Sequence, residues 1–282
     1  PVPPTATPVP PTATPVPPTP TPTTPPPTTN MMYVSSTTAG NVGGVAFNDE
    51  DILAYNKTTG AWSMLWDGSD VGITADVIAY SVRPDNSILM SFASAITVSG
   101  LGTVDDSDIV RFVPTSLGTN TAGSFEFYFD GSDVGLSNSS EDIDAITFTA
   151  DGKLVISTAG SYSVPGVSGA DEDLLVFTAS QLGQTTSGTW AMYFDGSDVG
   201  LSQSSSEDVN GAWFDVATGK LYLTTVGAFS VTGVSGDGAD IFICTPTSLG
   251  SNTACTYGPG LYWDGSANGF AGEIVDGFTI VP

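Results

Sequence analysis

The chain has 282 residues, of which 30 are acidic and only five are basic, and it contains no histidine. A net charge of −25 opposes nucleic-acid binding, which needs a basic surface, and no apolar run has bilayer-spanning length, so we expect neither nucleic-acid binding nor membrane insertion. Because 40% of the residues are hydrophobic and Gly, Ser, Thr and Val abound, the composition indicates a folded all-β protein rather than a disordered acidic tail.

Residues 1–30, PVPPTATPVPPTATPVPPTPTPTTPPPTTN, form a Pro/Thr-rich tail. Proline fixes φ and lacks an amide proton, so the tail is predicted to be an extended polyproline II spacer of roughly 90 Å. Threonines in such stalks are candidate O-glycosylation sites. These candidates are Thr5, Thr7, Thr12, Thr14, Thr19 and Thr21. Because the sequence begins at Pro1 without a signal peptide, it is interpreted as a mature product or a piece of a longer chain.

The remaining residues repeat an acidic turn about 65 residues apart. FDGSDVGLS occurs twice, from Phe129 and from Phe194, with a looser copy, WDGSDVGI, from Trp66 and a decayed copy, WDGSANGF, from Trp263. Between successive copies the sequence predicts four short strands separated by Gly, Asp and Pro. Large residues alternate along the fourth strand, as expected for a half-buried strand.

Repeated four-stranded units predict a β-propeller, here an all-β domain over residues 31–282 with four blades. The repeat units lie near residues 31–73, 74–137, 138–202 and 203–270, with a closing strand at 271–282. The first unit lacks its first strand, and VDGFTIVP at the C-terminus matches the missing strand, so the C-terminal strand is expected to pair with the N-terminal blade and close the ring. Small residues are expected at one column of the crowded inner strands, at Ala79, Ala145, Gly211 and Gly277. A β-solenoid or a pair of sandwiches is the alternative architecture.

In a propeller, the loop after the fourth strand and the loop between the second and third strands lie at the same end of the ring. Both kinds of loop are acidic here, and five basic residues cannot neutralise so many carboxylates. Calcium accepts irregular sets of oxygen ligands, so a bound calcium ion is one expectation; Asp side chains that only stabilise turns are the other. The candidate metal ligands are Asp49, Asp51, Asp67, Asp70, Asp76, Asp106, Asp108, Asp130, Asp133, Asp142, Asp171, Asp173, Asp195, Asp198 and Asp208.

Cys244 and Cys255 are predicted to face each other across the hairpin of the last blade, which favours a disulfide over a metal pair or two free thiols. A disulfide would place the protein in an oxidising, extracellular or cell-surface, compartment. NKT at Asn56 and NSS at Asn138 match the N-glycosylation pattern.

With its repeats and its tail, the chain resembles secreted bacterial β-propeller repeat proteins joined to Pro/Thr-rich spacers. The resemblance carries no catalytic motif, and without histidine a Ser–His or Cys–His site is excluded, which leaves only a carboxylate pair of the glycosidase kind. We expect a non-enzymatic structural or surface protein that forms a homo-oligomer or homopolymer, in a filament or coat, through its tail. The alternative is a calcium-dependent adhesion module that binds glycans or proteins.

Overall fold

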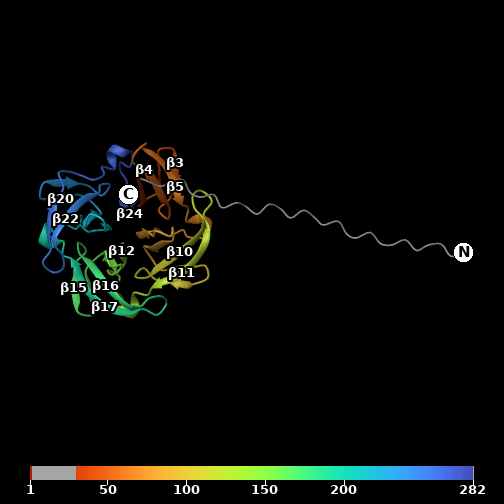
Figure 1. The fold of residues 1–282 in the computed structure, drawn as a ribbon, viewed down its shortest axis with the longest axis horizontal. Coiled ribbons are helices and arrows are strands. Elements are labelled where there is room, and N and C mark those ends of the chain that lie inside the picture. The colour runs from red at the N-terminus through yellow and green to blue at the C-terminus, as the bar shows by residue number, and fades with distance from the viewer. Residues whose placement is uncertain (2–29, 282) are drawn as a thin grey trace.

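The computed structural model describes Pro1 and residues 30–281, and residues 30–281 form a ring of four four-stranded antiparallel blades (Figure 1). The predicted polyproline tail and its candidate glycosylation sites lie outside the described residues. From the axis outward, the first blade comprises β24 (Val275–Val281), β1 (Met31–Ser36), β4 (Ile52–Asn56) and β5 (Ala61–Trp66). The second comprises β6 (Ala79–Val82), β7 (Ile88–Ser91), β10 (Ile109–Ser116) and β11 (Ala122–Phe129). The third comprises β12 (Ile143–Phe148), β13 (Leu154–Thr158), β16 (Leu174–Gln181) and β17 (Ser187–Phe194). The fourth comprises β18 (Gly211–Asp215), β19 (Lys220–Thr224), β22 (Phe242–Ser248) and β23 (Ala254–Tyr257).

The ring is closed by its own C-terminal strand, as the sequence predicted. Strand β24 pairs antiparallel with β1, so that Met31 lies opposite Val281 and Val34 opposite Phe278. The first blade therefore combines the two ends of the domain, and β24 covers the edge of β1 that could otherwise pair with another chain. Deleting β24 would expose the edge of β1 and leave the ring open.

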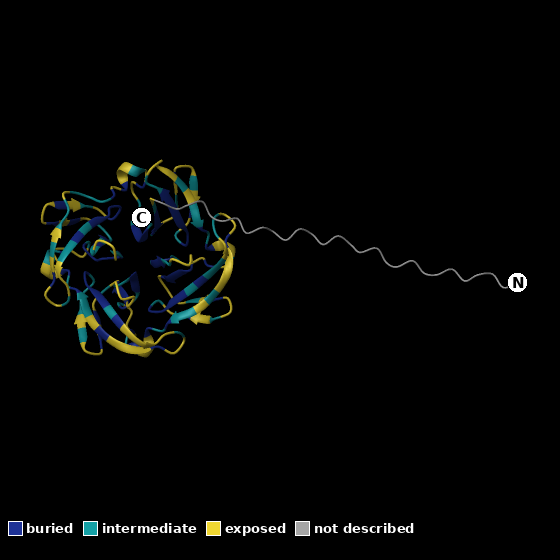
Figure 2. Ribbon diagram, viewed as in Figure 1, coloured by how far each residue is buried: buried dark blue, intermediate teal, exposed yellow. Residues whose placement is uncertain are grey.

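The four inner strands are tightly packed around the axis, and burial is greatest toward the inner part of the ring (Figure 2). The predicted small column is buried throughout. A Cβ atom on Gly277 would lie 3.0 Å from the ring of Tyr80 in the next blade, and one on Gly211 would lie 3.2 Å from the ring of Phe278 in the neighbouring first blade. The small residues are therefore required by close approach between blades.

Two local features differ from the sequence prediction. The loops between second and third strands, expected to be irregular, each contain a small hairpin. The hairpins are β2 (Gly40–Val42) with β3 (Val45–Phe47), β8 (Ile96–Val98) with β9 (Gly102–Val104), β14 (Tyr162–Val164) with β15 (Val167–Gly169), and β20 (Phe229–Val231) with β21 (Val234–Gly236). Two-residue turns such as Pro165-Gly166, with Gly166 at φ 87°, connect the strands of three hairpins, and the three residues 99–101 connect β8 with β9. The acidic turns, expected to be simple turns, contain single-turn 3-10 helices: η1 (Ser69–Val71), η2 (Ser132–Val134), η3 (Ser197–Val199) and η4 (Ser266–Asn268).

The disulfide between Cys244 and Cys255 is confirmed, with a Cα–Cα distance of 5.4 Å. The two residues are diagonal rather than directly opposite, because Cys244 pairs with Tyr257 and Cys255 with Pro246. In the second blade the corresponding Phe112 lies over Gly123, where an added Cβ would be 2.5 Å from its ring. The disulfide thus replaces a Phe–Gly contact.

Candidate functional site

The first three acidic turns each fasten one blade to the next. In the second blade's turn, the carboxylate of Asp133 accepts a hydrogen bond from the backbone N–H of Thr186 at 2.8 Å, and the hydroxyl oxygen of Thr186 accepts one from the N–H of Asp130 at 2.9 Å. Thr186 belongs to the loop between the third and fourth strands of the following blade. The same pair of bonds joins Asp67 and Asp70 to Thr121, and Asp195 and Asp198 to Thr253. We call this arrangement the interblade clasp.

The receiving loop carries its own repeated motif, Leu-Gly-x-x-Thr. It reads LGTNT at residues 117–121, LGQTT at 182–186 and LGSNT at 249–253. The first blade has only the short turn NKTTG at this place, and the fourth acidic turn, which faces it, has lost its second aspartate to Ala267. There the contact is made instead by Tyr55 and Trp62, which donate hydrogen bonds to the Asn268 side chain and main chain. The acidic turn therefore persists where its partner loop exists.

A second set of aspartates ties the two loops of each blade together. One oxygen of Asp108 accepts from the N–H of Asp105 at 2.8 Å, and the other accepts from the N–H of Gly131 at 3.1 Å. Asp51, Asp173 and Asp240 bond in the same way in the other blades. Asp240 was missed as a member of this set because its loop, DGAD, is less acidic than the others. In these hydrogen bonds the Asp side chains stabilise turns, which is the alternative to calcium binding stated in the sequence analysis.

A third set of carboxylates has no such partners, and it lies where an acidic loop meets the start of the next inner strand. The main-chain N–H of the strand donates to the main-chain oxygen of the loop, for example from Val209 to Asp171 at 3.2 Å. Carboxylates face each other across three of these junctions. The facing groups are Asp49 and Asp76, Asp106 and Asp142, and Asp171 and Asp208. At the fourth junction Gly238 faces Ile274, so both acidic groups are absent together.

The charged state of this third set is unfavourable because it is removed from water and surrounded by like charge. Burial, followed by the charge of Asp49, raises the pKa of Asp76 to about 7. Burial, followed by Asp171 and Glu172, raises the pKa of Asp208 to about 7, and burial with Asp106 and Asp105 raises that of Asp142 to about 6. Each of the three also has one buried oxygen, Oδ1, without a hydrogen-bond partner.

The structure thus divides the predicted metal ligands into three groups. The interblade clasp contains Asp67, Asp70, Asp130, Asp133, Asp195 and Asp198. The hydrogen bonds between the two loops of one blade are accepted by Asp51, Asp108 and Asp173. The interblade junctions bring together the other six, as facing pairs. Within residues 30–281, no three His, Cys, Asp or Glu side chains are arranged so that they could hold a metal ion as they stand.

The two candidate N-glycosylation residues lie in surface turns. The side-chain oxygen of Asn56 accepts hydrogen bonds from the N–H groups of Thr58 and Thr59. The side chain of Asn138 is exposed and donates to Glu141 at 2.9 Å.

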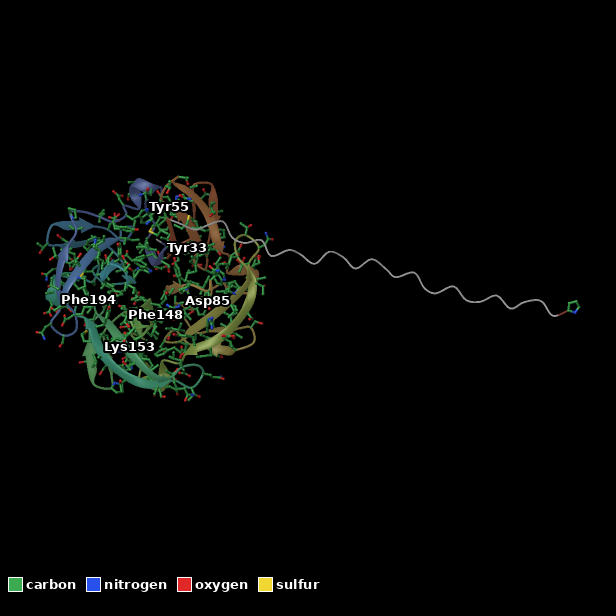
Figure 3. The ribbon with its side chains drawn as sticks, in the orientation of Figure 1. Tyr33, Tyr55, Asp85, Phe148, Lys153 and Phe194 are labelled. Carbon is green, nitrogen blue, oxygen red and sulfur yellow. A yellow bond between two sulfur atoms is a disulfide. The ribbon has the colours of Figure 1, made fainter. Side chains whose placement is uncertain are left out.

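The opposite end of the ring has a different chemistry. A depression of about 590 Å³ is lined by the ends of the inner strands and the turns that follow them. Its wall includes Phe148, Trp213 and Phe214, and the guanidinium of Arg83 lies 3.6 Å from the centre of the Phe148 ring. Figure 3 labels Phe148 and Tyr33 among the side chains near the middle of the ring. Sequence reasoning missed this depression because its residues come from separate blades.

The tail joins the ring at this same end. Val281 lines the depression and pairs with Met31, the first strand residue after the tail. The inner strands therefore begin among carboxylates at one end of the ring and finish at an aromatic depression at the other end, where Met31 begins the first strand of the chain.

Comparisons with known proteins do not assign the chain to a family. No protein-family model matches the chain, and no curated protein matches it. Among solved structures, the chain is similar to a catalytically inactive virginiamycin B lyase from Staphylococcus aureus, determined with quinupristin. The match has 9% identity and a TM-score of 0.34, and it covers 82% of this chain and 71% of that chain. None of the helical segments in residues 30–281 is long and apolar enough to cross a membrane.

Proposed function

We propose that this protein is a non-enzymatic structural protein of the cell exterior. Its propellers are joined into a filament or coat by their Pro/Thr-rich tails, and its acidic end binds calcium. The disulfide between Cys244 and Cys255 is consistent with an oxidising compartment.

The observation that supports tail-mediated assembly is the aromatic depression beside the attachment point of the tail. Proline-rich segments bind in aromatic-lined grooves, because a polyproline II chain loses little entropy on docking. Thirty residues of extended chain reach at most about 100 Å, which is sufficient to span to a neighbouring ring. The tail of one copy therefore has both a receiving surface on the next copy and the length to reach it.

The non-enzymatic part of the proposal is supported by how the acidic residues are used. Most recur from blade to blade and accept hydrogen bonds from backbone N–H groups, as at Asp133 and Asp173. An interaction that recurs in every blade is expected to stabilise the scaffold. A catalytic pair, in contrast, is expected at a single place in the molecule. The absence of histidine from the sequence excludes the common nucleophile–base pairs.

The glycan-binding alternative needs aromatic platforms beside the acidic turns. The nearest candidates, Trp66 and Trp263, are only 0% and 5% exposed and pack between strands. This burial favours the structural function.

Binding of a synthetic peptide of residues 1–30 to a chain that begins at residue 31 tests the proposal. We expect saturable binding, seen by calorimetry and by a change in tryptophan fluorescence, since Trp213 lines the depression. Val216 is 63% exposed at the rim of the depression, so Val216→Asp should weaken binding at least tenfold without unfolding the ring. Leu249→Asp, at a 37% exposed position outside the depression, is the control, and because Leu249 belongs to the LGSNT motif, thermal unfolding is measured for both variants. Absence of binding, or equal loss in both variants, would contradict docking of the tail in the depression.

A further inference from the structure

Two pairs of aspartates stand out at the acidic end of the axis, and we call them the axial carboxyl pairs. Asp276 on β24 reaches the carboxyl group of Asp76, which precedes β6. Asp144 on β12 reaches the carboxyl group of Asp208, which precedes β18. Each pair joins the inner strands of adjacent blades, and the two pairs lie at alternate interfaces around the ring.

Three of these four side chains are buried and Asp76 is half-buried, and each of the four has at least one oxygen without a hydrogen-bond donor. Asp276 is 3% exposed, Asp144 is 4% exposed and Asp208 is 8% exposed. Both oxygens of Asp144, Oδ2 of Asp276, and Oδ1 of both Asp76 and Asp208 have no hydrogen-bond partner. Leaving a buried carboxylate oxygen unpartnered costs several kcal/mol, and the group is stabilised either by taking up a proton or by a bound cation.

The other two interfaces show that the fold does not require these acids. At the position equivalent to Asp144 and Asp276, Asn210 donates a hydrogen bond to the main-chain oxygen of Val275 at 2.8 Å. The fourth equivalent position is Ile78. A neutral amide or an alkyl side chain therefore suffices, and the two Asp–Asp contacts serve another purpose.

Additional acidic groups surround each pair from the neighbouring loop. In addition to burial, the charges of Asp49 and Glu50 raise the pKa of Asp76, and those of Asp171 and Glu172 raise the pKa of Asp208. Like charges gathered in a buried place are stabilised by a cation at their centre. None of the ion pairs within residues 30–281 involves these four aspartates: Arg111 pairs with Asp85 and Glu126, and Lys153 pairs with Asp151.

We propose that each axial carboxyl pair binds one calcium ion, held by Asp76 and Asp276 in one site and by Asp144 and Asp208 in the other. This inference assigns the proposed calcium binding at the acidic end to particular residues. It rests on the proposed function only for the identity of the cation. All available ligands are oxygens, which suits calcium and does not suit zinc or copper. Because no three carboxylates converge as they stand, the remaining ligands are water, main-chain oxygens, and Asp49 or Asp171 after rotation of the side chain.

Calcium stoichiometry in the full-length protein tests the assignment. After removal of calcium with EDTA and titration with CaCl2 in a calorimeter, we expect two tight sites in the unmodified chain. Asp144→Asn and Asp276→Asn should each retain one site, and the double variant should retain neither. Asp130→Asn, in an exposed acidic turn, is the matched control and should retain both sites.

Thermal unfolding in EDTA confirms that the variants are folded. Because each substitution removes a buried carboxyl group whose ionisation is unfavourable, both should melt in EDTA at the same temperature as the unmodified chain or higher, while calcium should no longer raise Tm in the double variant. If the double variant binds calcium as the unmodified chain does, the axial assignment is wrong and calcium binding at the acidic end stands. If the unmodified chain binds no calcium, both the assignment and the proposed calcium binding are wrong.

Discussion

The interblade clasp gives a quantitative prediction at Asp133. Replacing Asp133 with Ala removes the acceptor of the 2.8 Å bond from the N–H of Thr186, a residue that is 3% exposed. Hydrogen bonds to charged acceptors contribute about 1.5–3 kcal/mol, and because Asp133 itself is exposed, water replaces part of this, which leaves about 1–1.5 kcal/mol. For a domain of this size the corresponding fall in Tm is roughly 3–5 °C. Urea unfolding followed by tryptophan fluorescence measures the loss, since the indole of Trp190 donates to the main-chain oxygen of Val134 in the same clasp.

The comparison with Asp133→Asn separates the hydrogen bond from the charge. Both variants lose one negative charge from a chain of net charge −25, but Asn keeps an oxygen that can accept from Thr186. We expect Asp133→Asn to be destabilised by less than half as much as Asp133→Ala. Ala267→Asp, in the fourth turn, should give no gain, because no Leu-Gly-x-x-Thr loop faces it. Equal stability of the Asn and Ala variants would refute the clasp as a source of stability.

Three further predictions concern the same end of the ring and the last blade. Gly131→Ala should lower the free energy of unfolding by about 1–3 kcal/mol, because the added Cβ would lie 2.2 Å from a main-chain oxygen of the facing loop; Gly258→Ala, with its nearest atom at 3.8 Å, should cost far less, as urea unfolding will show. Replacing both Cys244 and Cys255 with Ala should lower stability by about 2–3 kcal/mol, as expected for a closed loop with a sequence separation of 11; thermal unfolding that is unchanged by the substitution would count against this. In EDTA, Tm should fall as the pH rises from about 4 to 7. Burial and the neighbouring acids raise the pKa of Asp208 to about 7 in the folded state only, so the unfolded state loses its proton first and is favoured as the pH rises. A Tm that rises over this range would contradict the raised pKa of these buried carboxyl groups.

Much of the fold was predictable because aligning the repeated units shows which segments form equivalent strands. The permuted first strand, the small column at positions such as Gly277, and the pairing of Cys244 with Cys255 all follow from aligning the copies. The hairpins between the second and third strands were not predicted, because a strand of three residues is too short to show a recognisable alternation of apolar and polar residues.

The site was predicted less well, for a physical reason. Sequence reasoning left calcium binding and turn chemistry open for the acidic turns, and it did not predict that Asp133 and its equivalents accept hydrogen bonds from the next blade. The LGTNT, LGQTT and LGSNT motifs were a usable signal, since they are missing where the acidic turn has decayed. Asp144 and Asp276 could not be distinguished by sequence, because their neighbours in space come from other blades.

Sedimentation velocity of the full-length chain, compared with the chain that begins at residue 31, tests the proposed function most directly. We predict that the full-length chain sediments as large assemblies, which excess peptide of residues 1–30 disperses into single rings, and that the shortened chain sediments as a folded monomer. A full-length chain that remains monomeric at high concentration, or a shortened chain that assembles equally well, would contradict assembly through the tail.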